Sequence, residues 1–450
     1  MSLQQLHKWV RGEIELWSRD GLVSPAQAET LRRRYSVAES GPGWGMIVFS
    51  SLGAVIAGLG VILLFAYNWH AIPKFGKLAL VLGALAAVHG MGLRLFLAGV
   101  RFRNLGEGLC LLGTMLFGAG IWLVAQIYHI EEHFPNAFLI WGLGALALGL
   151  VMPSIPQAIL AAILLTTWCG IERIEFDTPM YAAPILLAVV LGGLAWWRKS
   201  RLLLGVILLA FTISIIFTLP DIDRHPWLIF CTVLNLGALW IALRFLARMY
   251  GGFHASAPVF GFFGWAIFYV SLYLLCFPEL NHHLLRIEHP LTGWIRVAWL
   301  APFVLTLFAW LVVLWNRILA GKGVEPEDPG FEIYLAPLVV LLVWCGILWP
   351  AIFDGWFLSA PCNLALLAFA VALMARGCRQ TQPGVAITGS ILLVALAVAR
   401  YFDLFDSLFL RGLVFIIIGA IIFAEGYLYA RTKKVKTKAT DPSAESASIT

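Results

Sequence analysis

The fold is decided where a long apolar helix ends in a polar and aromatic loop, at Trp122-Leu-Val-Ala-Gln126-Ile-Tyr128-His129-Ile-Glu131-Glu132-His133-Phe-Pro135-Asn136. Residues 106–127 form an apolar run long enough to cross a hydrocarbon core of about 30 Å at about 1.5 Å per helical residue. The loop that follows places groups capable of acid–base and metal chemistry beside hydrocarbon. The stretch therefore predicts a membrane helix that opens onto a polar vestibule near 122–136.

The composition of the whole chain agrees with a membrane protein. Of its 450 residues, 61% are apolar and only 12% are charged, and the mean hydropathy is +0.87. Soluble domains carry about 25% charged residues. Successive apolar runs of about 20 residues indicate spanning helices, since a barrel would show roughly 10-residue alternating segments. The sequence predicts an all-α, polytopic membrane helix bundle.

We expect this bundle to occupy residues 44–430 and to contain about fourteen spans. The fourth and fifth are joined only by Pro153-Ser-Ile-Pro156, so residues 137–171 fit either two spans or one re-entrant unit. The expected spans are 46–67, 76–96, 106–127, 137–152, 155–171, 180–197, 202–219, 227–246, 257–277, 295–315, 332–350, 357–375, 384–399 and 410–430.

Residues 1–40 predict a small cytosolic helical hairpin before the first span. Asp20-Gly21 ends its first helix, because glycine accepts the left-handed conformation of a helix cap. Ser24 and Gln27 predict a capping box at the second helix, with Pro25 at its first position. This hairpin either fixes the topology or docks a cytosolic protein. Residues 431–450 predict a basic, disordered cytosolic tail.

The distribution of basic residues predicts the orientation in the membrane. With the N-terminus inside, inner segments hold 23 of the 31 Lys and Arg residues. Cytoplasmic loops are enriched in Lys and Arg, so both termini are expected in the cytoplasm and the number of spans is expected to be even. The net charge of +6 reflects these loops and the tail, and indicates no nucleic-acid partner.

The loop after residue 127 offers one candidate metal site. His129-Ile-Glu131-Glu132-His133 matches the H-x-x-E-H pattern of a class of zinc peptidases, and a continuing helix would place His129, Glu132 and His133 on one face. A hydrated helix end explains the same residues, and the sequence offers no third ligand. We therefore expect no cofactor, with zinc as the alternative. The seven cysteines form no C-x-x-C pair and are expected to be small apolar packing residues.

Polar groups within or at the ends of the spans are the other candidates, because they commonly face a cavity or a partner helix. Each is equally explained by a hydrogen bond between helices. Together they would line a polar route through the membrane. These candidates are His89, Gln126, Tyr128, His129, Asn235, Arg400, Asp403 and Glu425.

Several local features resemble a bacterial family of predicted membrane proteins called domain of unknown function 2157. They are the N-terminal hairpin, Trp44-Gly45, Phe65-Ala-Tyr67-Asn68-Trp69 and Trp122-Leu-Val-Ala-Gln126-Ile-Tyr128-His129-Ile. Arg400-Tyr-Phe-Asp403 and Arg411-Gly412 resemble its C-terminal features more loosely. The resemblance implies a bacterial inner-membrane location, and it implies no activity and no metal site.

The sequence leaves several functions open. The number of spans, weakly similar hairpins and intramembrane polar groups favour a secondary transporter or a flippase of a small or lipid-linked substrate. A membrane scaffold or envelope-assembly factor that uses residues 1–40 for docking is the alternative. A metal-dependent membrane hydrolase built on the loop after residue 127 is the third. Enzymatic activity is the less favoured expectation, and the bilayer is the one partner that the composition requires.

Overall fold

The computed structural model describes residues 10, 13–18, 20–34, 72–129, 133–152, 154–219, 227–250, 254–278, 280–281, 293–319, 332–348, 355–403, 416, 419–420 and 423–424. Every regular element among these residues is helical. The chain divides into two units, Met1–Val81 and Leu82–Thr450. The expected first span, most of the fourteenth and the basic tail lie outside the described residues, so the count of fourteen stays a prediction.

The first unit contains the predicted hairpin. Residues 13–18 are helical, and α2 spans Pro25–Arg34. Gly21, with φ of 70°, adopts the left-handed conformation expected where the first helix ends. The capping box is present: the Gln27 amide donates to Ser24 Oγ at 3.3 Å, and the Ser24 amide donates to Gln27 Oε1 at 2.9 Å. Ile14 and Ala28 are buried, so the apolar stripes pack inward.

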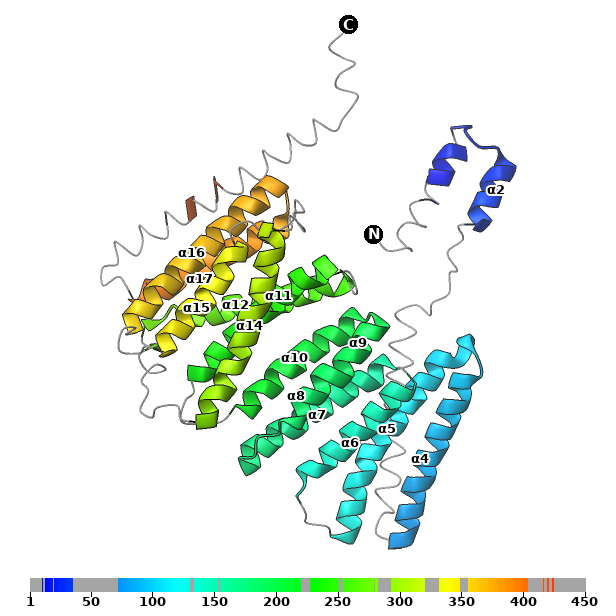
Figure 1. Cartoon of the computed structure of the whole chain (residues 1–450). Helices are drawn as coiled ribbons and strands as arrows, with labels where there is room; N and C mark the ends of the chain where they lie inside the picture. Colours follow the sequence, from blue (N-terminus) through cyan, green and yellow to red (C-terminus); the bar gives the residue numbers. More distant parts are fainter. Residues whose placement is uncertain are drawn as a thin grey trace. The chain divides into compact units, whose positions relative to one another are not determined.

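Twelve of the expected spans, from 76–96 to 384–399, correspond in order to described helical segments (Figure 1). Nine described helices are long and apolar enough to cross a membrane, and three shorter apolar segments accompany them. One of the shorter segments is built from α8, the π-helix η2 and α9. The bounds are α4 Lys74–Leu97, α5 Val100–Tyr128, α6 Pro135–Val151, α7 Ile155–Phe176, α8 Ala182–Ile185, η2 Leu186–Leu191, α9 Gly192–Arg198, α10 Arg201–Thr218, α11 Trp227–Tyr250, α12 Ala257–Leu274, α14 Gly293–Leu319, α15 Glu332–Leu348, α16 Gly355–Gln380 and α17 Pro383–Asp403.

Residues 137–171 form two separate helices, an arrangement shared by two spans and by a re-entrant unit, so the choice between them stays a prediction. Gly142 of α6 faces Leu164 of α7, and Gly149 faces Ala158. Residue numbers rise along α6 where they fall along the facing part of α7, so the two helices are antiparallel. The Ser154 side chain accepts a hydrogen bond from the Gln157 amide and caps the start of α7, so the short linker is sufficient to reverse the chain.

Small residues set the closest contacts between neighbouring helices. A Cβ atom on Gly118 of α5 would overlap the Trp141 ring of α6, and one on Gly377 of α16 would overlap the backbone of Ala386 in α17. Both pairs are antiparallel. These contacts explain the glycines within apolar spans, because small residues let membrane helices approach closely.

The helix that contains the expected span 106–127 starts earlier, because α5 begins at Val100. Only Ala98 and Gly99 separate α4 from α5. Gly99 has φ of 117°, a backbone conformation that glycine adopts without strain, and this permits the tight turn. Arg103, which precedes the expected span 106–127, therefore lies in the first turns of α5.

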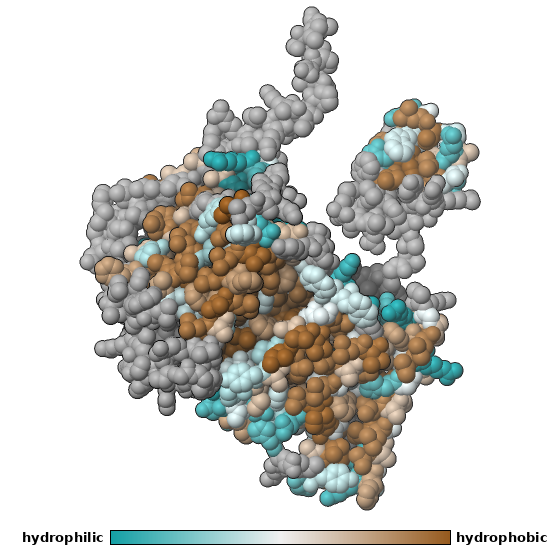
Figure 2. All heavy atoms as spheres, viewed as in Figure 1, coloured by the Kyte–Doolittle hydropathy of each residue, from teal (hydrophilic) through white to brown (hydrophobic). Residues whose placement is uncertain are grey.

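Large apolar side chains remain exposed on several helices, as a lipid-facing surface requires. Phe262 of α12, Trp315 of α14 and Phe357 of α16 are 71%, 68% and 70% exposed. Figure 2 shows apolar side chains over much of the visible face of the described helices. The seven cysteines are free and lie on described helices or their ends, and five of them are buried. They occupy the positions of small packing residues.

Candidate functional site

The polar side chains of α7 gather on one face, at both ends of the helix. Gln157, Trp168 and Glu172 fall within about 60° of one another around the axis at roughly 100° per residue. Buried Leu164 and Leu165 lie between the two ends. The helix therefore has two polar sites separated by an apolar middle, and each site has its own partners.

The site at the C-terminal end is built around Glu172, whose side chain is 2% exposed. Beyond Phe176 the chain turns through Asp177, whose left-handed φ of 52° ends the helix. This turn returns the backbone to Glu172, and the Thr178 amide donates to the Glu172 carbonyl oxygen at 3.1 Å. The helix cap thus folds back over the carboxylate.

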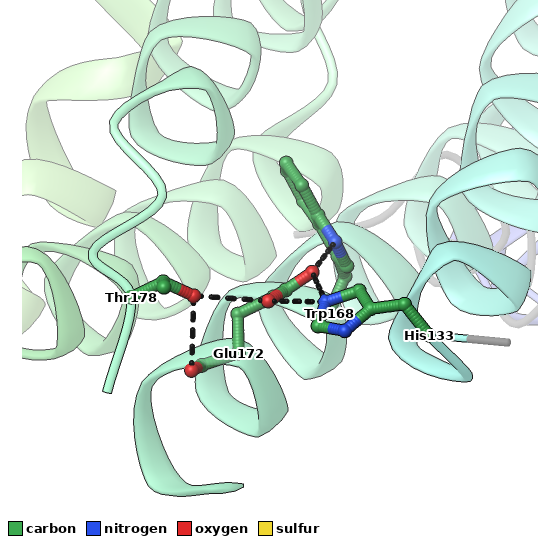
Figure 3. Close-up of polar contacts among 4 residues, drawn as sticks. All are labelled: His133, Trp168, Glu172 and Thr178. Atoms are coloured by element: carbon green, nitrogen blue, oxygen red, sulfur yellow. Dashed lines mark hydrogen bonds and ion pairs between the residues drawn. The ribbon is translucent and has the colours of Figure 1, made fainter. Parts of the chain in front are cut away.

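Three side chains surround the Glu172 carboxylate (Figure 3). His133 Nε2 lies 2.9 Å from Oε1 and 2.8 Å from Oε2. Trp168, one turn earlier on α7, donates from Nε1 to Oε1 at 3.0 Å. The Thr178 hydroxyl lies 3.0 Å from Oε2. Both carboxylate oxygens are therefore bonded, and the partners come from three different segments of the chain.

His133 joins a buried site to the surface. It lies two residues before the first residue of α6, its side chain is 37% exposed, and its ring packs on Phe176 with centroids 4.1 Å apart. A carboxylate only accepts hydrogen bonds, so an ionised Glu172 requires a proton on His133 Nε2. The pair is an ion pair when the imidazole is charged. The short Nε2–carboxylate distance allows a proton to lie on either partner.

The site at the N-terminal end of α7 consists of hydroxyls, an amide and one carboxylate. The Ser154 hydroxyl donates to Glu107 Oε1 of α5 at 2.5 Å. Gln157 Nε2 donates to Thr114 Oγ1 at 2.9 Å, and Trp141 Nε1 of α6 donates to the Thr114 carbonyl oxygen at 2.7 Å. These contacts connect α5, α6 and α7. Gln157 Oε1 is buried and has no hydrogen-bond partner among the described residues.

The structure does not have the helical face on which the candidate zinc site depends. The helix expected to continue through 133 ends at Tyr128, and His129 has φ of 53° as its left-handed cap. Residues 130–132 lie outside the described residues, and Glu132 is one of them. His133 bonds to Glu172 instead. A continuing helix therefore does not place His129 and His133 on one face, and the expectation of no cofactor, with zinc as the alternative, stays a prediction.

The other candidates before α6 have ordinary settings for a membrane helix. His89 of α4 is partly buried, its Nδ1 lies 3.1 Å from the Leu85 carbonyl oxygen, and its ring lies against Gly113 of α5. Gln126 and Tyr128 are exposed near the end of α5. None of these features by itself indicates a ligand.

Asn235 lies in the middle of α11 and is 1% exposed. Neither its Nδ2 nor its Oδ1 has a hydrogen-bond partner among the described residues. A buried amide that lacks partners costs stability, which is why such groups are rare in folded proteins. Asn235 therefore remains a candidate for the polar route.

Arg400 has a structural role that its sequence position did not reveal. Its Nη2 donates to the Cys276 carbonyl oxygen at 2.5 Å, and Asn363 Nδ2 of α16 donates to the same oxygen at 3.0 Å. This carbonyl follows the end of α12 at Leu274, where helical donors are missing. Arg400 thus holds the ends of α12 and α17 together. The side chain of Asp403 and the whole of Glu425, two further candidates, lie outside the described residues.

Sequence reasoning missed most of the groups at the two ends of α7. Glu172 was visible only as one of several acids expected on the outer side, and Trp168, Thr178, Glu107, Thr114 and Gln157 carried no local signal. The distance of 39 residues between His133 and Glu172 has no periodicity to detect. One usable signal existed: both residues were expected on the same side of the membrane.

No curated protein and no solved structure matches the chain. A family model described as "Predicted membrane protein (DUF2157)" matches residues 15–157. The match runs from the hairpin to the start of α7 and contains His133, but it ends before Glu172. Residues 15–157 thus match the family of predicted membrane proteins that the sequence resembles.

Proposed function

We propose that this multi-pass membrane protein is a secondary transporter or a flippase of a small or lipid-linked substrate, and that the ends of α6 and α7 separate and close during its cycle. One observation carries the proposal. The Glu172 carboxylate is 2% exposed at the end of an apolar helix, yet the imidazole that pairs with it is 37% exposed.

Burying a charged carboxylate such as that of Glu172 costs free energy. Removing a carboxylate from water costs several kcal/mol even after relaxation, and an apolar side chain at such a position is often at least as stable. Helix packing alone therefore does not explain a glutamate at position 172. Ionisable groups in membrane helices usually face a cavity or a pathway. Because the His133 side chain is 37% exposed, the pair can separate without moving a second buried group into water.

Location and orientation belong to the same proposal. The family resemblance supports a bacterial inner-membrane location. The excess of Lys and Arg on one side supports both termini in the cytoplasm, with His133 and Glu172 on the outer side. Reporter fusions to the C-terminus and to the loop at 282–292 test this orientation. A C-terminal reporter that is active only outside the cytoplasm would contradict it.

The function is tested by transport in proteoliposomes made from the purified full-length protein. Solid-supported membrane currents are recorded for sugars, amino acids, carboxylates and quaternary amines, and movement of fluorescent phospholipids is followed in parallel. We expect one substrate class to be moved by the wild type and by Glu175→Gln, an exposed acid one turn from the site, and to be lost in Glu172→Gln. Activity that is indifferent to Glu172→Gln, or no movement of any class, contradicts the proposal.

A membrane scaffold is the second candidate, and the N-terminal hairpin favours it. Leu16 and Leu22 are 51% and 72% exposed in the hairpin, although Ile14 and Ala28 are buried there. Deleting residues 1–40 separates the two functions. A transporter keeps its substrate movement in proteoliposomes after the deletion, whereas a scaffold inserts normally and loses its protein partner.

A further inference from the structure

The groups around the Glu172 carboxylate are all hydrogen-bond donors. Trp168 offers an indole N–H, Thr178 offers a hydroxyl, and His133 offers Nε2–H. The indole nitrogen has no lone pair to offer. Among the described residues, no group of three or more His, Cys, Asp or Glu side chains is suited to a metal ion. Among the described residues, the carboxylate therefore accepts from one indole N–H, one hydroxyl and, when Nε2 is protonated, one imidazole N–H.

This arrangement distinguishes between the cations that a transporter can couple to. Sodium and other hard metal cations need several oxygen ligands around them, and the N–H and O–H groups here occupy the directions those ligands would take. A proton needs one oxygen lone pair. We propose that Glu172 is a proton-binding site and that protons, rather than metal cations, are the coupling ion of this protein.

Few charged side chains of the described residues lie near Glu172, so few groups enter the charge balance of the site. Arg173 and Asp177 pair with each other on α7, and Glu175 is exposed. The neighbouring segments α6, α8 and η2 carry no charged side chain, and the one charged residue of α10, Arg201, begins that helix at its other end. Among the described residues, His133 is thus the titratable group that faces Glu172 from outside α7.

The step conserves one proton. In the closed state the imidazolium of His133 donates its Nε2–H to the ionised Glu172. The Nε2–H bond breaks, an O–H bond forms on the carboxylate, and both groups become neutral. The same short distance then serves an O–H···Nε2 hydrogen bond without ionic attraction. The start of α6 can leave α7 at that point, and Glu172 stays buried without a charge. His133, which reaches the surface, regains a proton from water.

Infrared difference spectroscopy on the purified full-length protein tests this site without knowledge of the substrate. We expect acidification to produce a protonated-carboxyl C=O band that persists in Glu175→Gln and disappears in Glu172→Gln. His133→Ala should increase the band at a fixed pH, because the positive partner of the carboxylate is gone. Replacing choline chloride by sodium chloride at constant pH should leave the band unchanged.

Two results would overturn the inference: a band that survives in Glu172→Gln, or a band that sodium removes at constant pH. Should Glu172→Gln fail to fold, His133→Gln provides the second variant, and a band unchanged by it would also count against the site. The coupling part of this inference rests on the proposed function. Protonation of Glu172 without any substrate movement would support the proton-binding site and contradict the transport function. Substrate movement without protonation of Glu172 would contradict only the proton-binding site.

Discussion

The two ends of α7 are polar in different ways. At the N-terminal end, Ser154, Gln157 and Thr114 are each 1% exposed or less, and their hydrogen bonds connect three helices. At the C-terminal end, an equally buried carboxylate depends on a side chain that is 37% exposed. The partners at the first site, Glu107 and Trp141, are partly buried, whereas His133 at the second site is exposed.

This difference indicates which end of the helix can move. Opening the N-terminal end would strand several polar groups at once, the Glu107 carboxylate among them, each with its own desolvation cost. Opening the C-terminal end removes one imidazole, and a single proton can compensate the charge that remains. We infer that α7 is anchored at Ser154 and separable at Glu172. The predictions below test this asymmetry.

The largest effect is expected for His133→Ala. The variant leaves Glu172 buried without its ionic partner, and we expect a loss of roughly 1–3 kcal/mol in stability, below the range for fully buried pairs because His133 is partly exposed. Thermal unfolding of the purified protein in detergent measures the loss. The double variant His133→Ala/Glu172→Gln should recover part of it. Losses that simply add in the double variant would show that the two side chains are not coupled.

Ser154→Ala should have an intermediate effect, about 1–2 kcal/mol, because it removes a helix cap and the hydrogen bond to Glu107 together. Ser24→Ala is the matched control, since Ser24 caps α2 in an exposed setting with Gln27 alone. Its local cost should be about 0.5–1 kcal/mol. Hydrogen exchange of the first-turn amides of α7 and α2 compares the two caps. Equal effects would mean that Glu107 adds nothing to the anchored end.

The smallest effect is expected for Gln157→Met combined with Thr114→Val. The pair of substitutions removes a donor together with its acceptor, and it also removes Gln157 Oε1, which has no partner among the described residues. Replacing both partners by apolar groups of similar shape is often nearly neutral, so we expect a change within about 1 kcal/mol. Thermal unfolding again gives the value. A loss as large as that of His133→Ala would contradict the assignment of charge to one end and packing to the other.

The sequence predicted what depends on local rules. Apolar runs located the twelve described spans, and Ser24-Pro25-Ala-Gln27 predicted both hydrogen bonds of the capping box. Ser154-Ile-Pro-Gln157 has the same spacing, but here the Gln157 side chain reaches across to Thr114 instead of back to its own cap. A tertiary partner can replace a local one, and a single sequence contains no sign of that choice.

The site itself depends on contacts that local rules do not describe. The pattern at His129 and His133 suggested a shared helix face, but the helix ends at Tyr128 and the chain turns away. His133 instead contacts Glu172, which comes after α6, a short turn and most of α7. A pairing of this kind arises from the antiparallel packing of α6 on α7, so it becomes visible only when both helices are placed side by side.

Hydrogen exchange, followed by mass spectrometry on the wild type and on Glu172→Gln, tests the central asymmetry most directly. The neutral glutamine imitates protonated Glu172 and removes the ionic attraction to His133. The account predicts faster exchange in peptides covering 133–138 and 172–178, and no change in 154–160. Faster exchange at 154–160 with no change at the other end would contradict it.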